Sequence, residues 1–574
     1  MAVAMNILDR NDLKIQLIYP PFLERRTHNE DIKAMPIGVY SLGAVLKEKG
    51  FDVELSNCCL MVDALKEMEE ILFKRNPKIL AFSVFNGNRW GAIDLARLAK
   101  RHDPQVRVIF GGVGATFLSE HLLHHFSEID VIVLGEGERT LPSLLDCLSE
   151  TNSPDFHLIQ GIAYRHEGKI INTGRPEPIE DLDDLPIPAA YFKYEHISTS
   201  RGCVWECAFC GSPAFWERRV RYRSPDHVVG ELEILYRKGL RFFYFSDDTL
   251  TIKKKRVIEI CRKIIEGGLE ISWFAISRVH DIDEEILYWM RRAGCIQLSY
   301  GVESGSERIR DVLKKRITTE QIKRAFDLTV QYGILPRAYF IYGSPGESDE
   351  TIEESIGLMK EIKPLSAIFY ALDLFPGMEL YESLKQRGVL SDDLWKNKIE
   401  GLLYSEIDPH LTHNQVRAFG KRLRRAFYEN LSAFVEAIQL VDREDLYPFH
   451  ADFCSRLAMT FSQGDYSRHK MIPDKDRIAE ALFRKALRYA PDHRAFLGLS
   501  LLLQKRGEWN ASIHLLTRGL EWFPTSEHIQ LALGVNYMNR REYAEALSCF
   551  SKFPHSEKAR HYMALCEEAI KVSG

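Results

Sequence analysis

The chain has 574 residues, of which 45% are hydrophobic and 27% charged, and its formal net charge is −5. This length predicts about three to four domains with ordinary globular cores. The negative charge argues against general binding to nucleic acid, which needs many basic contacts to phosphates, and leaves only a local basic patch as an alternative. No apolar run reaches about 18 residues, so we expect no membrane-spanning helix. No signal peptide is evident, and we expect a cytoplasmic protein.

Residues 13–150 alternate short apolar strands with amphipathic helices. Alternation of this kind predicts an α/β domain with a parallel, doubly wound, Rossmann-like sheet. Ligands of such sheets bind beyond the carboxyl ends of the strands. The strands are expected at about residues 14–20, 51–56, 79–85, 106–112 and 130–135. Helices are expected at about residues 37–49, 90–101 and from 117 onward.

Glycines follow the last two strands of this domain, in Gly111-Gly112-Val-Gly114-Ala-Thr116 and in Gly135-Glu136-Gly137-Glu138. Glycine permits positive φ and lets a ligand approach the backbone closely. The alternative is that these glycines only form tight turns. The pattern therefore indicates a ligand site or a pair of sharp loops.

Residues 151–196 are expected to form a connector with a hairpin at Glu167-Gly168 and a proline-rich stretch. Residues 197–400 return to alternating strands and helices. Five or six such units predict a partial or full parallel (β/α) barrel with its chemistry at the strand carboxyl ends. Its main strands are expected at about residues 241–248, 271–277, 296–304, 337–344 and 367–375.

The C-terminal third is expected to be helical, with residues 401–473 of no clear role. In residues 474–570, Gly507-Glu-Trp-Asn-Ala-Ser-Ile recurs 34 residues later as Arg541-Glu-Tyr-Ala-Glu-Ala-Leu. A 34-residue helical period is typical of the tetratricopeptide (TPR) repeat, which predicts an all-α TPR-like solenoid. Its concave face would bind a protein partner or a neighbouring domain. The alternative is a plain helical cap.

Cys203, Cys207 and Cys210 form a Cys-x3-Cys-x2-Cys motif with an aromatic residue, Phe209, before the last cysteine. The usual [4Fe–4S] cluster has four thiolate ligands, so three cysteines would leave one iron open to a small molecule. A zinc site and a disulfide are the alternatives. Zinc prefers four ligands, often as paired Cys-x2-Cys units, and no second pair exists. The motif therefore favours an open-iron cluster.

This motif resembles that of the radical S-adenosylmethionine (SAM) superfamily. The resemblance implies that the amino and carboxylate groups of SAM chelate the open iron. An electron from the reduced cluster would then split SAM, and the 5′-deoxyadenosyl radical would take a hydrogen atom from an unreactive carbon. The cofactors would carry this chemistry while the protein orients them. A reductant such as flavodoxin or ferredoxin is implied as a partner.

Residues near the expected strand ends resemble the SAM-binding segments of that superfamily. Asp247 and Asp248 would meet the SAM amino group, and Arg278 would pair with its carboxylate. Glu303 and Ser304 would contact its ribose and methionine. The resemblance assigns SAM contacts to Phe209, Asp247, Asp248, Arg278, Glu303, Ser304, Gly343 and Pro345.

The pairing of an N-terminal sheet with a cluster domain resembles the cobalamin (B12)-binding class of radical SAM proteins. The segments that carry this resemblance are Pro20-Pro21-Phe, the two glycine segments and Asp183-Asp184-Leu-Pro186-Ile-Pro188. The implied cobalamin contacts are Pro21, Ser83, Gly111, Gly112, Gly114, Thr116, Gly135, Glu136 and Gly137. The chain departs from classical cobalamin proteins because it has no Asp-x-His-x-x-Gly segment, and Thr27-His28 has the wrong spacing. Some members of the class keep this domain without the cofactor.

Three functions follow. The first is cobalamin-dependent methyl transfer to an unactivated carbon of a small-molecule or lipid-like substrate. The second is cyclisation or C–C bond formation on a lipid or tetrapyrrole, with a non-methylating or vestigial cobalamin domain. The third is a TPR scaffold, which would not require the cysteine motif. The basic run 218–223 is either a contact for an anionic substrate or a structural face, and Trp205 and Trp216 are either cavity walls or packing residues.

Overall fold

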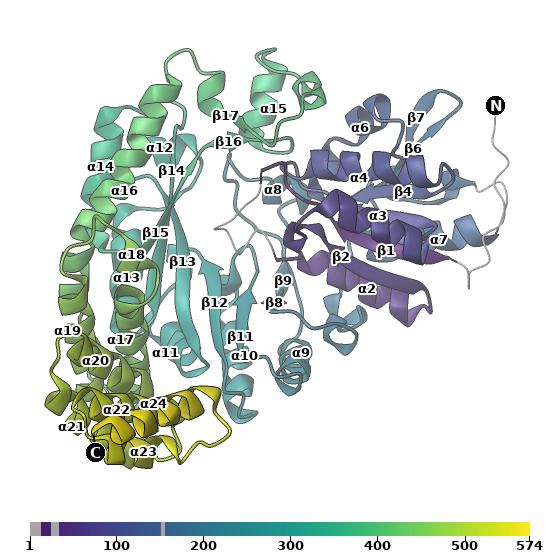
Figure 1. Ribbon diagram of the computed structural model, residues 1–574. Helices are drawn as coiled ribbons and strands as arrows, with labels where there is room; N and C mark the ends of the chain where they lie inside the picture. The colour runs from purple at the N-terminus through teal and green to yellow at the C-terminus, as the bar shows by residue number, and fades with distance from the viewer. Residues whose placement is uncertain (1–12, 25–33, 151–154, 574) are drawn as a thin grey trace.

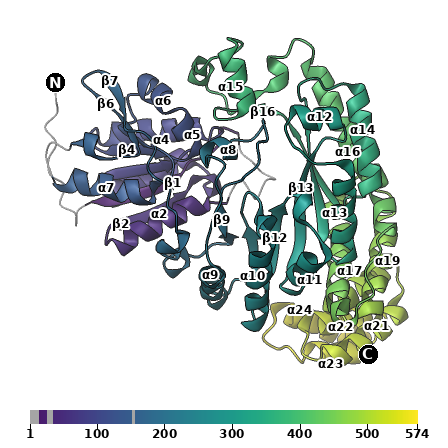
Figure 2. The same ribbon diagram turned by 180° about the vertical axis from the view of Figure 1, so that it is seen from behind.

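The computed structural model describes residues 13–24, 34–150 and 155–573. An N-terminal α/β domain faces a second, larger sheet, and the C-terminal helices pack at the far side of that sheet (Figures 1 and 2). In the described part of the chain, no helix is long and apolar enough to cross a membrane.

The N-terminal sheet has seven strands in the order β2-β1-β3-β4-β5-β6-β7. The first five strands along the chain are parallel, as predicted. They are β1 (Lys14–Tyr19), β2 (Asp52–Asn57), β3 (Ile79–Ser83), β4 (Arg107–Gly111) and β5 (Val131–Val133). The order of the strands puts the carboxyl ends of β1, β3, β4 and β5 along one edge, which is the edge that the glycines follow.

The predicted hairpin is present, but it extends this sheet rather than linking two domains. β6 (Ile162–His166) pairs antiparallel with β5, and β7 (Lys169–Asn172) forms the outer edge. Glu167 and Gly168 both have positive φ, of 49° and 77°, as a two-residue hairpin turn requires. The hairpin covers the edge of β5, which would otherwise expose unpaired backbone groups.

Helices cover both faces of this sheet (Figure 1). They are α2 (Ile37–Glu48), α3 (Ala64–Arg75), α4 (Arg89–His102), α5 (Val113–Phe117), α6 (Ser119–His125) and α7 (Gly137–Glu150). The helix predicted from residue 117 begins earlier, at Val113, and is interrupted at Leu118. The early start follows from Gly112, whose φ of 90° turns the chain directly from β4 into α5.

The second sheet has six parallel strands in the order β15-β14-β13-β12-β11-β8. Because the two outer strands do not pair with each other, the partial barrel is the correct alternative. The strands are β8 (His196–Ile197), β11 (Phe242–Phe245), β12 (Ser272–Ser277), β13 (Cys295–Glu303), β14 (Leu335–Tyr342) and β15 (Ser366–Ala371). Its main helices are α9 (Pro225–Arg237), α10 (Lys254–Glu266), α11 (Glu284–Arg292), α12 (Glu307–Val312), α13 (Thr319–Gln331) and α14 (Asp349–Ile362).

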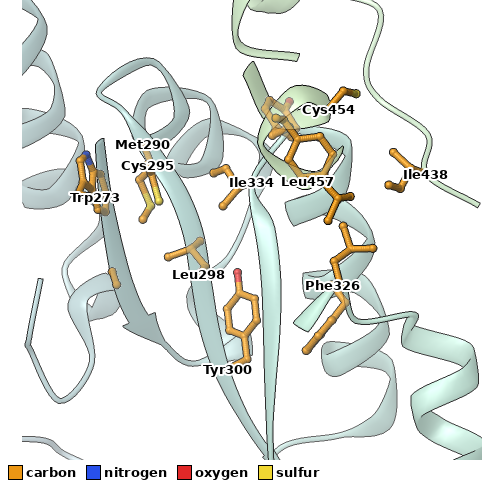
Figure 3. Close-up of a cluster of buried hydrophobic side chains, with 14 of the residues drawn as sticks. Trp273, Met290, Cys295, Leu298, Tyr300, Phe326, Ile334, Ile438, Cys454 and Leu457 are labelled. Atoms are coloured by element: carbon orange, nitrogen blue, oxygen red, sulfur yellow. The ribbon is translucent and has the colours of Figure 1, made fainter. Parts of the chain in front are cut away.

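Along β11, β12 and β14 every second residue is buried under the helices, whereas the edge strand β15 is only partly covered. Figure 3 shows Leu298 and Tyr300 of β13 pointing toward the same core as Phe326 of α13 and Leu457 of a later helix. The apolar core therefore continues from the sheet into the C-terminal helices. This continuity makes the C-terminal helices part of the same folded body.

Residues 373–407, which we call the strap, leave the second sheet and pack against the N-terminal domain. The strap contains β16 (Asp373–Leu374), α15 (Glu379–Gln386), a short 3₁₀ helix η8 (Asp392–Lys396) and β17 (Leu402–Leu403). Its Trp395 is fully buried in the core of the N-terminal domain. The boundary predicted at residue 400 thus falls inside a segment that joins both domains.

The long helix predicted after residue 413 is α16 (His413–Glu436), which ends beside α17 (Tyr447–Ser462). After the short helix α18 (Asp465–Arg468), six further helices follow, each packed against the next. They are α19 (Lys475–Tyr489), α20 (His493–Lys505), α21 (Trp509–Trp522), α22 (Glu527–Asn539), α23 (Tyr543–Phe550) and α24 (Glu557–Ser573). This region is helical as expected, and its assignment to TPR repeats stays a prediction.

Candidate functional site

The cysteine motif lies in the loop between β9 (Ser200–Arg201) and α8 (Ser212–Phe215). The amide of Cys210 donates to the carbonyl of Cys207 at 3.1 Å, which closes a turn. Ala208 is held on both sides: its amide donates to the carbonyl of Leu313 at 3.0 Å, and its carbonyl accepts from the amide of Leu380 at 3.0 Å. The loop is therefore tied to both the second sheet domain and the strap.

The three thiols suit a cluster better than a single zinc ion. All cysteines are free, which excludes the predicted alternative of a disulfide. Among the described residues, the three sulfur atoms do not form a group within 4.8 Å of one another, as the ligands of one ion would. Separate irons of a [4Fe–4S] cluster fit this wider set of sulfur donors. Burial raises the pKa of Cys210 to about 12, so this thiol stays protonated unless a metal displaces the proton.

Arg278 contacts the cysteine loop through a hydrogen bond to Cys207 and a cation–π contact with Trp205. Its Nη1 donates to Cys207 Sγ at 3.3 Å, and its Nη2 donates to the carbonyl of Lys315. The guanidinium carbon lies 4.1 Å from the ring centroid of Trp205, which in turn stacks on His280. Each Nη atom thus donates to the protein, while the buried Nε has no partner in the described structure, and the pairing of Arg278 with the SAM carboxylate stays a prediction. Trp205 is a packing partner of this arginine.

Glu303 ends β13 in the left-handed region, with φ of 64°, a conformation that costs free energy in a residue other than glycine. Its carboxylate is buried and accepts from Lys315 Nζ at 2.7 Å. A Cβ on Gly301 would lie 2.2 Å from this carboxylate, which explains the glycine. Lys315 also lies 5.8 Å from the ring of Phe209. Sequence reasoning found Glu303 but missed its lysine partner.

Two of the predicted SAM-contact residues bond to other parts of the protein. Asp247 is buried and accepts from the amide of Thr199 at 2.9 Å and from the hydroxyl of Ser200 at 2.7 Å. Ser304 is fully buried and bonds to Ser355 and to the amide of Ser306. Both side chains fasten neighbouring segments, and their contacts with SAM stay predictions.

Asp248 is the accessible member of the acidic pair. Its carboxylate accepts from the hydroxyl of Ser212 at 2.9 Å and borders the same cavity as Cys210. Solvent reaches this side chain, yet the surrounding protein raises the pKa of Asp248 through desolvation. Asp248 is therefore the acidic group of this loop that a ligand could meet.

The turn after β14 carries Gly343 and Pro345. The amides of Gly343, which has φ of 79°, and of Ser344 donate to the carboxylate of Glu347. Burial raises the pKa of Glu347 to about 7, although these two bonds oppose the rise. The other carboxylate oxygen of Glu347 and the hydroxyl of Ser344 are buried without a partner in the described structure. The contacts of Gly343 and Pro345 with SAM stay predictions.

A cavity of about 560 Å³ lies between the two α/β domains. On the N-terminal side its lining includes Ser83, Gly111, Gly112, Gly135, Glu136 and Gly137. On the other side its lining includes Cys210, Gly211, Ser212, Trp216 and Asp248. The cysteine loop and the glycine loops therefore face one shared, largely apolar space. An apolar wall with glycines at its loops suits a large, flat cofactor such as a corrin.

Pro21, Gly114 and Thr116 do not line this cavity, and their contacts with cobalamin stay predictions. A Cβ on Gly114 would lie 2.6 Å from the backbone of Phe85, so this glycine allows two loops to approach. The hydroxyl of Thr116 donates to the carbonyl of Gly112 at 2.9 Å and accepts from the amide of Gly135 at 3.1 Å. The close approach of two loops explains Gly114, while Gly112 makes a turn and also lines the cavity.

Family comparisons agree with this division. The model of the Radical SAM superfamily matches residues 197–359, and that of the B12 binding domain matches residues 32–145. An uncharacterized methyltransferase of Pyrococcus horikoshii is 30% identical over 461 residues, which cover 77% of this chain and 97% of that protein. The chain belongs to the radical SAM enzymes that carry a B12-binding domain.

Other relatives of this radical SAM enzyme have different names. The anaerobic magnesium-protoporphyrin IX monomethyl ester cyclase of Rubrivivax gelatinosus is 31% identical and covers 61% of this chain and 66% of that protein. The structure of the methyltransferase TsrM from Kitasatospora setae, with cobalamin and a [4Fe–4S] cluster bound, has a TM-score of 0.58 at 17% identity. It covers 84% of this chain and all of that chain. At this identity the TsrM likeness concerns the fold.

Buried ion pairs join the B12-binding domain to the radical SAM domain. Arg201 donates to Glu136 and to Glu138, each at 2.6 Å, and Arg221 donates to Glu136 at 2.5 Å. Burial acts to raise the pKa of Glu136, but the bonds from the two arginines outweigh burial and hold this pKa below its usual range. Glu136 borders the cavity but mainly fastens the domain interface, a role that no local pattern indicated.

The basic run 218–223 is structural. Arg218 pairs with Glu206, Arg219 with Glu180 and Arg223 with Glu231. Together with Arg221, these arginines bind carboxylates of the protein itself, which favours the structural alternative over an anionic substrate. Of the two predicted alternatives for Trp216, a cavity wall or a packing residue, the structure agrees with the cavity wall.

The cavity offers one described histidine, His227 of α9 in the radical SAM domain. Its Nδ1 accepts from Arg223 Nε at 2.8 Å and lies 3.2 Å from Asp183. The cavity wall of the B12-binding domain contributes no histidine in the described ranges. Thr27-His28 lies outside the described residues. A corrin held here would meet backbone and small side chains on the wall of the B12-binding domain, and the contact of Ser83 with it stays a prediction.

Proposed function

We propose that this enzyme is a cobalamin-dependent radical SAM methyltransferase that methylates an unactivated carbon of an apolar small molecule. The observation that carries the proposal is the single cavity bordered by Cys210 and Asp248 on one side and by the glycine loops on the other. The methyltransferase name of the Pyrococcus relative supports it. The [4Fe–4S] cluster, SAM and cobalamin are the cofactors that follow.

When bound, the cluster and SAM would supply a carbon radical, and methylcobalamin would supply the methyl group. Cys203, Cys207 and Cys210 would hold three irons, and Arg278 would keep Cys207 in place through its hydrogen bond. Asp248 would offer an acceptor to the amino group of SAM. Glu303 and Lys315 would shape the wall beside Phe209.

The protein must also keep water away from reactive intermediates. The ion pairs of Glu136 and Glu138 and the packing of the strap hold the two domains together over the cavity. The largely apolar lining of the cavity limits the number of polar groups that could hold water there. A firmly joined, largely apolar interface supports radical chemistry better than hydrolytic chemistry.

The face of the second sheet that points away from its helices supports an apolar substrate. Tyr244 and Phe274 have ring centroids 5.5 Å apart, and Tyr339 and Tyr370 have theirs 6.1 Å apart. Ile276, on the same face, is 40% exposed. Aromatic and aliphatic side chains that are exposed together favour an apolar or lipid-like ligand over a charged one.

A cyclase or C–C bond-forming enzyme is the second candidate, because the Rubrivivax cyclase is 31% identical over 373 residues. The same apolar sheet face could receive a tetrapyrrole. Methyl transfer from SAM distinguishes the two functions. We further propose that flavodoxin or ferredoxin reduces the cluster and that the C-terminal helices are TPR-like repeats that bind a protein partner. A pure scaffold would leave the cysteine motif and the shared cavity without a use.

The test is anaerobic purification followed by analysis of iron, sulfide and corrin, and then incubation with SAM labelled in its methyl group. We expect the protein to contain corrin and the label to appear in methylcobalamin. The labelled methyl group should then appear in a compound of an added apolar extract. Deoxyadenosine without any methyl transfer would favour the cyclase. Absence of both corrin and deoxyadenosine from protein with a full cluster would refute the proposal.

A further inference from the structure

A second group of metal-binding side chains lies outside the shared cavity, where the strap meets the B12-binding domain. His121 and His125 come from α6, and Asp393 comes from η8 of the strap. One ligand atom from each of these three side chains lies within 4.8 Å of the other two. In both ribbon views α6 lies on the side of its domain that faces α15 of the strap (Figures 1 and 2).

The geometry points to a zinc site formed by His121, His125 and Asp393, which ties the strap to the B12-binding domain. The two histidines are four residues apart on one helix, so their rings share a face, with centroids 4.6 Å apart. Two imidazoles and a carboxylate are a ligand set that zinc prefers, and hard cations such as Mg²⁺ prefer oxygen alone. Water would complete the tetrahedron.

The hydrogen bonding of these side chains also fits a missing cation. His121 Nε2 is buried and has no hydrogen-bond partner in the described part of the chain. His125 Nε2 lies 3.7 Å from Asp393 Oδ1, too far for a hydrogen bond but suitable for two ligands of one ion. A zinc ion would bond to all three atoms at about 2.0–2.2 Å after small side-chain shifts.

One cation already competes for the carboxylate. Lys396 Nζ lies 2.9 Å from Asp393 Oδ1, on the exposed side of the strap. A carboxylate has several lone-pair positions on its two oxygens, so Asp393 can keep this lysine and still bind a metal. Asp392 is not part of this group, and its two oxygens accept from Tyr381 and Lys385.

The site would connect distant parts of the enzyme. The strap carries Phe375, which lines the shared cavity, and Leu380, whose amide bonds to the cysteine loop. A zinc ion between α6 and η8 would therefore hold the strap, and through it the cysteine loop, against the B12-binding domain. This inference concerns the domain interface and does not depend on which reaction the enzyme performs.

The test measures zinc in the full-length, anaerobically purified enzyme after incubation with zinc chloride and removal of loosely bound metal. We expect about one zinc per chain by elemental analysis, and nitrogen and oxygen ligands at the zinc X-ray absorption edge. Iron does not contribute at that edge. H121A and D393N should each lose this zinc while keeping their iron.

The matched control is H124A, because His124 is exposed on the same helix and is not part of the group. H124A should retain zinc at the wild-type level. H125Q keeps most of the side-chain volume, so the protein should fold normally while one zinc ligand is missing. H125Q should therefore also lose zinc. Equal zinc in H121A and wild type, no retained zinc in wild type, or sulfur ligands at the zinc edge would each overturn the inference.

Discussion

The two walls of the shared cavity are built in different ways. On the radical SAM wall the side chains that could take part in chemistry are the Cys210 thiol and the Asp248 carboxylate, which border the cavity directly. On the B12-binding wall apolar side chains and the glycine loops form the lining, and Gly112 lies where a side chain would meet the backbone of Val84. Substitutions on the first wall should therefore remove chemistry, while those on the second should change shape.

The largest effect is expected at the cysteines. Cys203→Ala, Cys207→Ala or Cys210→Ala removes one of only three thiolate ligands, so we expect loss of the cluster and of all SAM cleavage. Iron content and deoxyadenosine release measure this. Cys147→Ala, outside the motif, should retain both. Full activity in any motif variant would contradict the assignment.

The buried pair of Glu303 and Lys315 should come next. Lys315→Met leaves Glu303 buried without its partner, which typically costs about 3–5 kcal/mol. For Lys315→Met we expect a large fall in the free energy of unfolding, measured with denaturant. For Glu303→Gln we expect weaker SAM binding at an unchanged iron content. The exposed pair of Lys314 and Glu379 is the matched control and should be worth about 1 kcal/mol or less. Equal losses at both pairs would contradict this account.

On the B12-binding wall, substitutions at the adjacent residues Gly111 and Gly112 should distinguish an effect on the cofactor pocket from an effect on stability. Gly112 has φ of 90°, and its Cβ would lie 2.9 Å from the carbonyl oxygen of Val84, so Gly112→Ala should destabilise the protein by about 1–3 kcal/mol. Gly111 has room for a Cβ, whose nearest neighbour would be 3.7 Å away. Gly111→Val should therefore lower corrin content with little change in the melting temperature. An unchanged corrin spectrum in Gly111→Val would count against the proposed pocket.

The smallest effect concerns pH and Glu347. Its pKa of about 7 lies above the usual value, so the folded protein holds a proton that the unfolded chain releases near pH 4.5. Stability from this group is full below the unfolded pKa and is lost as pH rises through about 7. The melting temperature should fall less between pH 5.5 and 8 in Glu347→Gln than in wild type. An identical slope in both proteins would refute the raised pKa.

The sequence predicted those features of the fold and the site that are set by residues close together in the chain. The cysteine spacing, the strand alternation and the turn at Glu167-Gly168 are all readable within a few residues, and the structure agrees with the elements predicted from them. The use of Asp247 was not readable, because its partners Thr199 and Ser200 lie 48 and 47 residues away. The same reason hid the lysine beside Glu303 and the arginines that bind Glu136.

The strap and the hairpin show a second limit. The sequence predicts the hairpin as part of a connector and places the strap across the end of the barrel and the start of the helical region. Their true positions follow from pairing and packing: β6 completes the edge of β5, and Trp395 fills the core of the N-terminal domain. Which distant surface a short segment covers depends on the whole fold and not on its own periodicity.

The two backbone bonds of Ala208 have a consequence for how the enzyme matures. Leu313 belongs to the radical SAM domain and Leu380 to the strap, which is anchored in the B12-binding domain. If the two domains separated to admit a bulky corrin, the two backbone bonds of Ala208 would strain the cysteine loop, which must also receive iron and sulfide. Corrin should accordingly enter before the inorganic centre is assembled, and the order of addition during reconstitution should decide the yield of intact enzyme.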